Sequence, residues 1–373
     1  MTTPRTAADW LHNIRQLALP NPVKIMNVCG GHERSITAAG LRSALPDWLE
    51  LIPGPGCPVC ICPEEDVHEA IQIALHEAVI LVAFGDMLRV PVNVPKAEAR
   101  SLEQAKARGA DIRPIASPME AVAIATAHPT RTVVFFAAGF ETTMAPVAAM
   151  LAQGVPDNLQ VLLSGRLTWP AVALLLASET AGFDALIAPG HVATVMGSAE
   201  WQFVVEQHHI PTAVAGFTPE SLLAAMYSTL RQYQQQCYFL DNCYPELVKP
   251  AGNLAAQAIL HQVFTVVDAN WRGIGTIPAS GFQLAPRYQA QDARLTFTGY
   301  RDAKRRRAGE MPAGCDCARV VLGKIYPNQC VLYGVACTPR HPIGPCMVSD
   351  EGACRIWWAS GVRHPRPISP VNG

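Results

Sequence analysis

The sequence is poor in charged residues and has no long apolar run. Aspartate, glutamate, lysine and arginine make up only 16% of its 373 residues, and the formal net charge is −1. This balance excludes the strongly basic surface that binds nucleic acid or an anionic membrane. The longest apolar runs, such as AVILVAF at 78–84, are much shorter than the roughly 20 residues that span a bilayer. The opening segment MTTPRTAADWLHNIRQ lacks the apolar core of a secretory signal, so we expect a cytoplasmic protein.

Cysteine, in contrast, is abundant and unevenly placed. Of the twelve cysteines, four lie at 29–62, two at 237 and 243, and six within 315–354. A reducing cytoplasm does not sustain a framework of structural disulfides, so metal binding or thiol chemistry is the expected use. Half of the residues are hydrophobic, which supplies a large core and excludes global disorder.

Short apolar runs alternate with segments of helical length. Residues 117–128, for example, offer Ser117 as N-cap and Glu120 at the capping-box position, and 65–77 form a second expected helix. Strands that alternate with helices predict an α/β fold with parallel sheets buried on both faces. The predicted strands end in glycine, proline or small polar residues and lie at 23–28, 78–84, 132–138, 160–164 and 184–188.

This alternation runs twice along the chain and then stops. We predict two Rossmann-like α/β domains with parallel sheets, at residues 1–113 and 114–235. The first carries CGGHE and GPGCPVC, and the second carries GFETT and PGHV. From residue 236 the chain is rich in Cys, Gly and Pro, which predicts a loop-rich C-terminal domain over 236–373.

Unusual motifs follow three of the predicted strands. Ligands of parallel sheets bind beyond the carboxyl ends of the strands, so these motifs indicate one shared cleft. Gly139, Glu141 and His191 are therefore candidate cofactor-binding residues. A glycine turn before a helix also explains the last two motifs, and a lone histidine is more often structural. The motifs are CGGHE at 29–33, GFETT at 139–143 and PGH at 189–191.

Cys29 is the strongest single candidate. Gly30 and Gly31 after it permit close approach of the backbone, and His32 is placed to act as a base or a supporting partner. A helix that begins here would lower the thiol pKa and favour the thiolate. The alternative is a buried, inert cysteine beside a glycine turn.

Cys57 and Cys60 form a C-x-x-C motif in the stretch GPGCPVC. Two intervening residues allow both sulfurs to meet each other or one metal ion. The flanking Gly and Pro favour a redox turn with dithiol and disulfide states. Structural zinc, with help from Cys62 and His68, and an inert loop are the alternatives.

The C-terminal segment holds six cysteines at irregular spacing. A zinc ribbon would show two paired C-x-x-C knuckles, whereas a [4Fe–4S] cluster needs four thiolates that converge on a cube. We therefore predict a [4Fe–4S] cluster held by four of the six, with a group of zinc ligands as the alternative. The six are Cys315, Cys317, Cys330, Cys337, Cys346 and Cys354.

Long motifs in a fixed order resemble those of the HypD family of hydrogenase maturation proteins over essentially the whole chain. The resemblance implies two α/β domains and a third, cluster-bearing domain. It also implies a scaffold on which the Fe(CN)2CO unit of [NiFe]-hydrogenase is assembled, with a HypC-type small chaperone and a HypE-type cyanide donor as partners. The motifs are CGGHE at 29–33, GLRSALP at 40–46, GPGCPVC at 54–60, FGDMLRVP at 84–91, AAGFETT at 137–143, SGRLTWPA at 164–171, APGHVATVMG at 188–197, WRGIGTIPASGF at 271–282 and CTPRHPIGPCMVSDEGAC at 337–354.

The resemblance also implies roles for single residues. Cys29 would hold the iron that carries CN and CO, with His32 beside it, and Cys57 and Cys60 would be the nearby dithiol. Cys62 departs from the family pattern and is either a third thiol or a small core residue. A different function, a cluster-dependent protein thiol–disulfide oxidoreductase, would not need Cys29.

Overall fold

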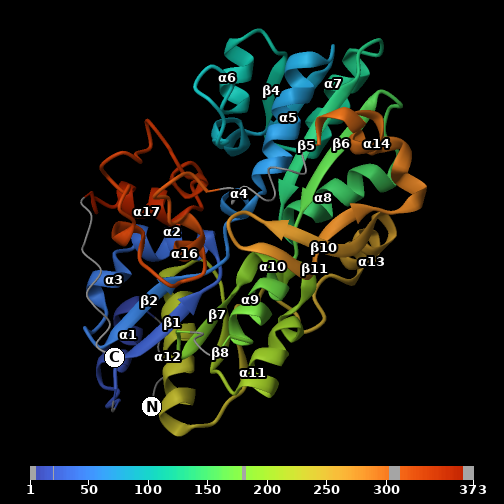
Figure 1. Cartoon of the computed structure of the whole chain (residues 1–373). Helices are drawn as coiled ribbons and strands as arrows, with labels where there is room; N and C mark the ends of the chain where they lie inside the picture. Colours follow the sequence, from blue (N-terminus) through green and yellow to red (C-terminus); the bar gives the residue numbers. More distant parts are fainter. Residues whose placement is uncertain (1–5, 20, 179–181, 302–310, 364–373) are drawn as a thin grey trace.

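Two parallel β-sheets form the frame of the protein (Figure 1). The computed structural model describes residues 6–19, 21–178, 182–301 and 311–363. The predicted α/β fold with parallel sheets is confirmed, because every neighbouring pair of strands in both sheets is parallel. No helix within the described residues is both long and apolar enough to span a bilayer.

The first sheet, sheet A, has five strands. Helices α1, α2 and α12 cover one face, where Ile14, Ile36 and Leu222 pack against Ile25. Helices α9, α10 and α11 cover the other face. The strand order is β2 (Leu49–Pro53), β1 (Val23–Asn27), β7 (Ala185–Pro189), β8 (Thr212–Ala215) and β9 (Leu240–Cys243). The helices around it are α1 (Ala7–Arg15), α2 (Gly30–Ala38), α3 (Leu41–Ala44), α9 (Thr168–Leu176), α10 (Gly190–Met196), η2 (Ser198–Trp201), α11 (Gln202–His208) and α12 (Pro219–Gln235).

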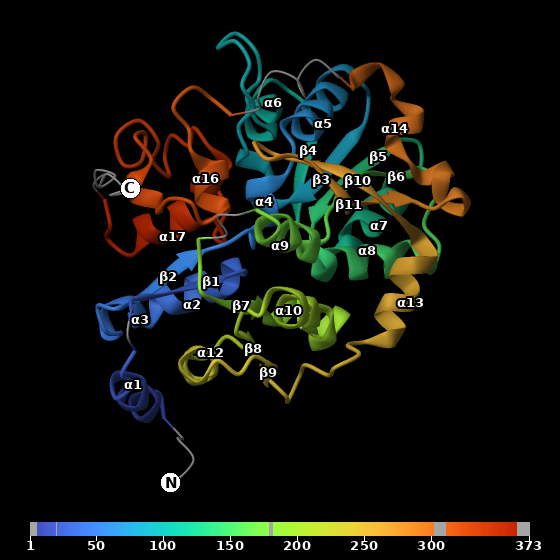
Figure 2. The same cartoon turned by 60° about the horizontal axis from the view of Figure 1, so that its bottom comes forward.

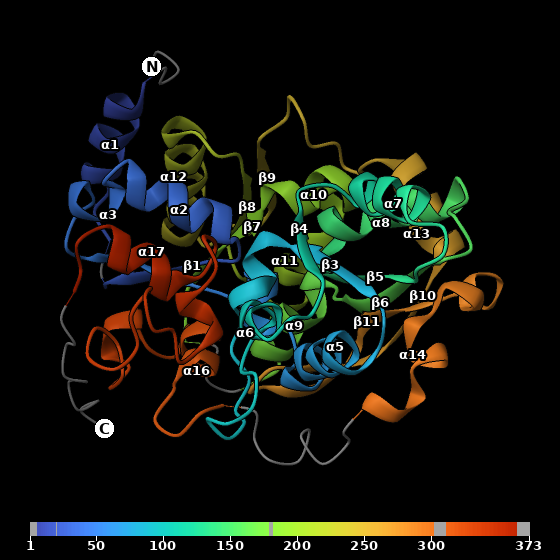
Figure 3. The ribbon, with the colours of Figure 1, turned by 90° about the horizontal axis from the view of Figure 1, so that it is seen from above.

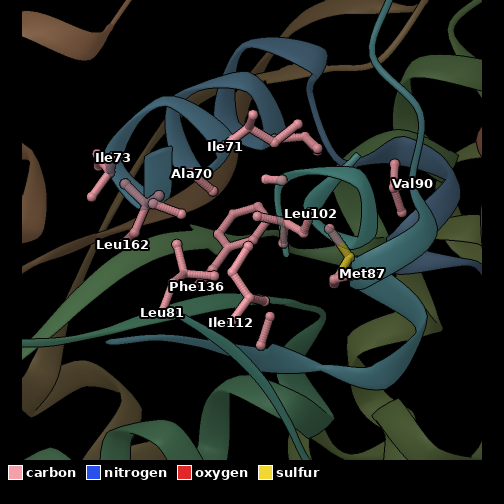
Figure 4. Close-up of a cluster of buried hydrophobic side chains, with 14 of the residues drawn as sticks. Ala70, Ile71, Ile73, Leu81, Met87, Val90, Leu102, Ile112, Phe136 and Leu162 are labelled. Carbon is pink, nitrogen blue, oxygen red and sulfur yellow. The ribbon is translucent and has the colours of Figure 1, made fainter. Parts of the chain in front are cut away.

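The second sheet, sheet B, has four strands. One face packs on α5 and α6, where Phe136 and Leu162 meet Ile71 and Leu102 (Figure 4). The other face packs on α7, α8 and α13. The strand order is β4 (Ile112–Ile115), β3 (Ile80–Phe84), β5 (Val133–Gly139) and β6 (Leu159–Gly165). The helices are α5 (Glu64–His76), η1 (Gly85–Arg89), α6 (Leu102–Ala107), α7 (Pro118–Ala127), α8 (Glu141–Ala152) and α13 (Leu254–Val263).

An antiparallel hairpin and a series of short helices complete the chain. The hairpin is β10 (Phe264–Trp271) and β11 (Gly275–Leu284). The C-terminal residues fit the loop-rich domain that the sequence predicts, and they lie beside α2 and α4 (Figures 2 and 3). The short helices are α4 (Pro58–Ile61), η3 (Pro286–Gln291), α14 (Ala293–Thr296), η4 (Thr298–Tyr300), α16 (Cys317–Val321), η5 (Pro327–Gln329), η6 (Pro345–Met347) and α17 (Ala353–Ala359).

All five predicted strands are present, with ends within two residues of the predicted ones. The capping box is present too, because Ser117 caps α7 and Glu120 accepts from the Ser117 N–H at 3.1 Å. The sequence analysis did not identify β2, β4, β8 and β9, which are four or five residues long.

The two sheets interleave along the chain. Sheet A takes strands from residues 23–53 and again from 185–243, whereas sheet B occupies 80–165. The predicted division between residues 113 and 114 falls inside β4, so it does not separate the two sheets. The reason is physical: an apolar run shows that a strand exists, but which strand it pairs with depends on long-range packing.

Candidate functional site

The carboxyl ends of strands from both sheets meet at Cys29. In sheet A the strand order reverses at β1, with β2 on one side and β7 on the other. Such a reversal leaves a crevice beyond the strand ends, where parallel sheets bind ligands. Cys29 lies two residues beyond β1, at this crevice.

A small cavity on one side of Cys29 is lined by sulfur, and we call it the sulfur cavity. Its cysteines come from three separate parts of the chain: the end of β1, helix α4 and helix η6. Residues more than 300 positions apart therefore share one cavity. Its lining includes Asn27, Cys29, Glu33, Gly54, Gly56, Cys57, Cys60, Cys346 and Glu351.

A second small cavity lies on the other side of Cys29, and we call it the threonine cavity. Sheet B contributes to it through the start of α8, directly after β5, and sheet A contributes the start of α10, directly after β7. The GFETT and PGH motifs thus reach the same cysteine as CGGHE, in agreement with the shared cleft expected from their positions. The lining includes Cys29, Phe140, Thr142, Thr143, Thr168, His191 and Glu351.

Cys29 is the N-cap residue of α2 and is only 8% exposed. Burial, with a smaller contribution from the charge of the nearby Glu351, raises the pKa of its thiol to about 12. The N–H groups of His32 and Gly31 act in the opposite direction, as the sequence analysis expects at the start of a helix, but burial outweighs them. Cys29 therefore carries a proton near neutral pH, and a metal ion must displace it.

Glycines allow three chain segments to meet at Cys29. A Cβ on Gly56 would lie 2.5 Å from both Cα and N of Cys29, and the Gly30 N–H donates to the Gly56 carbonyl at 3.0 Å. A Cβ on Gly30 would lie 2.5 Å from Cβ of Glu351. Any side chain at these positions would separate the segments that form the sulfur cavity.

His32 is fully buried, and both ring nitrogens have partners other than Cys29. Nε2 donates to the Ala215 carbonyl at 2.9 Å, and Nδ1 lies 3.1 Å from Oδ1 of Asn27. Burial lowers the pKa of His32 to about 3, so the ring is neutral near pH 7. His32 thus holds α2 against the ends of β1 and β8, three residues after Cys29, the candidate iron ligand.

Cys57 and Cys60 form a disulfide with a Cα–Cα distance of 5.3 Å. Cys57 is also the N-cap of α4, where its Sγ accepts from the Cys60 N–H at 3.1 Å. Cys62 points elsewhere: its Sγ lies 3.4 Å from Ser164 Oγ, within the core of sheet B. Burial raises the pKa of Cys62 to about 12, an environment that suits a small core residue.

The six C-terminal cysteines share one apolar core with Trp271 and Tyr333. Sγ of Cys315 lies 3.5 Å from Sγ of Cys317, and Cys317, Cys346 and Cys354 lie within hydrogen-bonding reach of one another. Within the described residues, no three or more His, Cys, Asp or Glu side chains are arranged to hold a single metal ion.

The three candidate cofactor-binding residues lie in different places. His191 lines the threonine cavity and stacks on Phe217 with ring centroids 3.8 Å apart. Glu141 is buried behind it, where its carboxylate accepts from the Thr168 N–H at 2.6 Å and from the Thr168 hydroxyl at 2.8 Å. Burial raises the pKa of Glu141 to about 7. The Gly139 carbonyl accepts from the Arg166 N–H at 2.9 Å, so Gly139 and Glu141 support the wall that His191 lines.

A larger cavity of about 430 Å³ lies beside sheet B, away from Cys29. Its charged groups bind one another: Arg294 Nη2 lies 2.7 Å from Asp66 Oδ1, and Arg294 Nε lies 3.0 Å from Glu69 Oε2. Such a buried ion network ties α14 to α5, and we assign the chemistry to the cysteine-lined cavities instead.

The sequence analysis did not single out Glu351, Thr168 or Gly56 as site residues. Glu351 and Thr168 line cavities beside Cys29, and Gly56 contacts its backbone. The available signal was indirect, because each lies within a motif quoted for the family resemblance: SDEGAC, SGRLTWPA and GPGCPVC. Only the folded chain shows that all three lie at one cysteine.

Comparisons with known proteins agree with this arrangement of motifs. The HypD family model, described as "Hydrogenase formation hypA family", matches residues 5–361. The chain is 42% identical over 341 residues to the hydrogenase maturation factor HypD of Escherichia coli (strain K12), covering 90% of this chain and 89% of that protein. It is 40% identical over 369 residues to that of Rhodobacter capsulatus, covering 96% of each. It is 38% identical over 347 residues to that of Azotobacter vinelandii, covering 91% of this chain and 89% of that protein.

Proposed function

Since the chain belongs to the HypD family of hydrogenase maturation factors, we propose that it is a scaffold on which the Fe(CN)2CO unit of a [NiFe]-hydrogenase is assembled. The observation that carries the proposal is the sulfur cavity, where Cys29, the Cys57–Cys60 disulfide and Cys346 share one lining. The proposed anchor for a metal fragment would then lie beside a cysteine pair that can exist as dithiol or disulfide.

Cys29 is the proposed anchor for the iron. Low-spin Fe(II) that carries cyanide and carbon monoxide is a soft metal centre and favours thiolate ligands. Binding of the iron would release the proton that burial keeps on Cys29. The second thiolate would come from a HypC-type small chaperone, and cyanide from a HypE-type donor. The exposed side chain of His191 marks the threonine cavity as the side open to such partners.

The C-terminal cysteines are the proposed holders of a [4Fe–4S] cluster. The residues present fit this group in two respects. Six thiols gather in one apolar core with Trp271, and the next residue, the buried Arg272, has side-chain N–H donors without a partner among the described residues. A cluster supplies electrons one at a time, and four thiolates bind its four irons. Cys346 lines the sulfur cavity as well, which brings this core next to the disulfide.

Infrared spectroscopy tests the assembly proposal directly. The protein purified anaerobically with its HypC-type partner should show cyanide and carbonyl stretching bands. Cys29→Ala should remove these bands and the bound iron while the chain stays folded by circular dichroism. Cys237→Ala is the matched control, because Cys237 is exposed and should leave the bands intact. A folded Cys29→Ala protein that keeps the bands would overturn the role of Cys29.

A second function is favoured by the disulfide itself. A cluster-dependent protein thiol–disulfide oxidoreductase would use Cys57 and Cys60 as its working pair and would not need Cys29. The two functions separate in one experiment. If Cys29→Ala reduces protein disulfides as well as the unmodified chain does, and no cyanide bands accompany the unmodified chain, the oxidoreductase function replaces the scaffold.

A further inference from the structure

Arg272 is a fully buried arginine whose hydrogen bonds are incomplete. It is 1% exposed, and its Nη2 donates to the Pro91 carbonyl at 2.7 Å and lies 3.4 Å from Glu64 Oε2. Its Nε and Nη1 are buried and have no hydrogen-bond partner among the residues that the structure describes. Buried donors without partners are rare and destabilising, so two of them on one side chain require an explanation.

The position of Arg272 in the fold suggests a reason for these two donors. Its backbone N–H donates to the Ile61 carbonyl at 3.0 Å, directly after Cys60. The preceding residue, Trp271, packs in the core that holds the C-terminal cysteines, and a Cβ on the following Gly273 would lie 2.9 Å from Cβ of Ala318. The backbone of Arg272 therefore runs beside the disulfide helix α4 and next to the cysteine core, and its guanidinium group reaches Pro91 and Glu64 at the start of α5.

Electrostatic effects agree with this position. Sγ of Cys315, which lies 3.5 Å from Sγ of Cys317, is close enough to Arg272 to be affected by its charge. The Arg272 charge also opposes the burial that raises the pKa of Cys62. The charge of Arg272 therefore reaches cysteines of both the C-terminal core and the segment that follows α4.

We propose that Arg272 is a fixed positive charge that raises the reduction potential of the Cys57–Cys60 disulfide. Reduction breaks the S–S bond and takes up two electrons, together with two protons for two thiols or one proton for a thiol and a thiolate. A buried positive charge stabilises the thiolate product and so shifts the equilibrium toward the reduced pair. The inference deepens the redox part of the proposed function and rests on it.

A purely structural role is the competing explanation, since Arg272 also binds the Pro91 carbonyl. The two roles predict different results for lysine. Arg272→Lys keeps the charge but loses the planar fork, whereas Arg272→Gln keeps hydrogen-bonding capacity and loses the charge. If Arg272→Lys keeps the equilibrium constant for reduction of the disulfide and Arg272→Gln does not, the charge is responsible. If both variants change it equally, the role of Arg272 is structural.

The experiment equilibrates the whole chain with mixtures of reduced and oxidised dithiothreitol, which supply the electrons and protons. Acid quenching, alkylation and mass spectrometry of the Cys57–Cys60 peptide give the reduced fraction. For Arg272→Gln we expect the equilibrium constant for reduction to fall about tenfold, equivalent to about 30 mV for this two-electron couple. For Arg272→Lys we expect a change of less than about threefold, or about 14 mV.

Two further variants make the test decisive. Arg319→Gln is the matched control, because Arg319 follows the cysteine pair in sequence but is 51% exposed and pairs with Asp316 at 3.5 Å. It should not change the equilibrium constant. Glu64→Gln removes the negative charge that opposes Arg272, so it should raise the equilibrium constant for reduction several-fold. This variant tests the proposal if Arg272→Gln does not fold.

An unchanged constant in folded Arg272→Gln, an equal fall in Arg272→Lys, or a fall in Glu64→Gln would each overturn the proposal. Failure here is distinguishable from failure of the assembly function. The infrared bands of the unmodified complex do not depend on this potential, and the potential can be measured whether or not the bands are present.

Discussion

Replacing Gly56 with alanine should separate Cys29 from the disulfide, because this glycine allows the two segments to touch. The new Cβ would lie 2.5 Å from Cα and N of Cys29. Both are backbone atoms and cannot rotate away. Reaching 3.4 Å, where ordinary van der Waals contact begins, requires a shift of about 0.9 Å between β1 and the GPGC loop.

The structure gives the size of the effect. Overpacking of a tight interior contact costs roughly 1–3 kcal/mol. The same shift weakens the hydrogen bond from Gly30 N–H to the Gly56 carbonyl, worth about 1 kcal/mol. We therefore expect Gly56→Ala to lower the free energy of unfolding by about 2–4 kcal/mol and to reduce iron retention at Cys29.

Urea denaturation followed by circular dichroism measures the first effect, and iron content after purification with the chaperone measures the second. Gly85→Ala is the matched control: no atom lies within 4 Å of its Cβ position, so its stability should stay the same or rise by less than about 1 kcal/mol. If Gly56→Ala matches Gly85→Ala in both measurements, the close approach at Cys29 does not matter and the reasoning is refuted.

Three further predictions concern single groups. Cys330→Ala should lower the iron and sulfide content of the reconstituted protein and its absorbance near roughly 400 nm, and unchanged content would contradict a ligand role. Iodoacetamide at pH 7 should modify exposed Cys237 much faster than Cys29, whose burial raises its thiol pKa to about 12; equal rates by mass spectrometry would contradict this burial. Burial raises the pKa of Glu141 to about 7 and that of Glu200 to about 9, so the fold holds protons that the unfolded chain releases. The free energy of unfolding should then fall as pH rises from about 4.5 to 7, by up to about 1.4 kcal/mol per pH unit for each group, and Glu200→Gln should flatten this slope in urea titrations.

Much of the fold could be predicted from the sequence because buried parallel strands are continuous apolar runs. The strands that were missed show the limit of this signal. β4 reads IRPI and β9 reads LDNC, and both lie at sheet edges, where polar residues and proline are tolerated. The pairing of strands is even harder to predict from the sequence, since β1 pairs with β7 about 160 residues later in the chain.

For the site, the sequence motifs indicated which residues carry the chemistry, but they did not predict the net direction of the pKa shift of Cys29 or the hydrogen bonds of His32. The start of a helix at Cys29 follows from CGGHE, and its N–H groups do lower the thiol pKa. The net change in the pKa of Cys29 has the opposite sign because burial, together with the charge of the distant Glu351, outweighs these N–H groups. The same limit applies to His32. Its partner Ala215 is remote in sequence, so the motif alone does not show that both ring nitrogens have hydrogen-bond partners.

The C-terminal region forms one wall of the sulfur cavity and also carries six cysteines. Helix α2 begins next to Cys29, and its Glu33 accepts from Trp357 Nε1 of α17 at 2.8 Å. Arg42 pairs with Glu33 at 2.9 Å and stacks over the Trp357 ring. These contacts join α17 to α2, the helix that Cys29 caps. Deleting residues 311–363 would remove the six thiols, Glu351 and this support together, so only point variants can separate the electron-transfer role of the region from its part in holding iron.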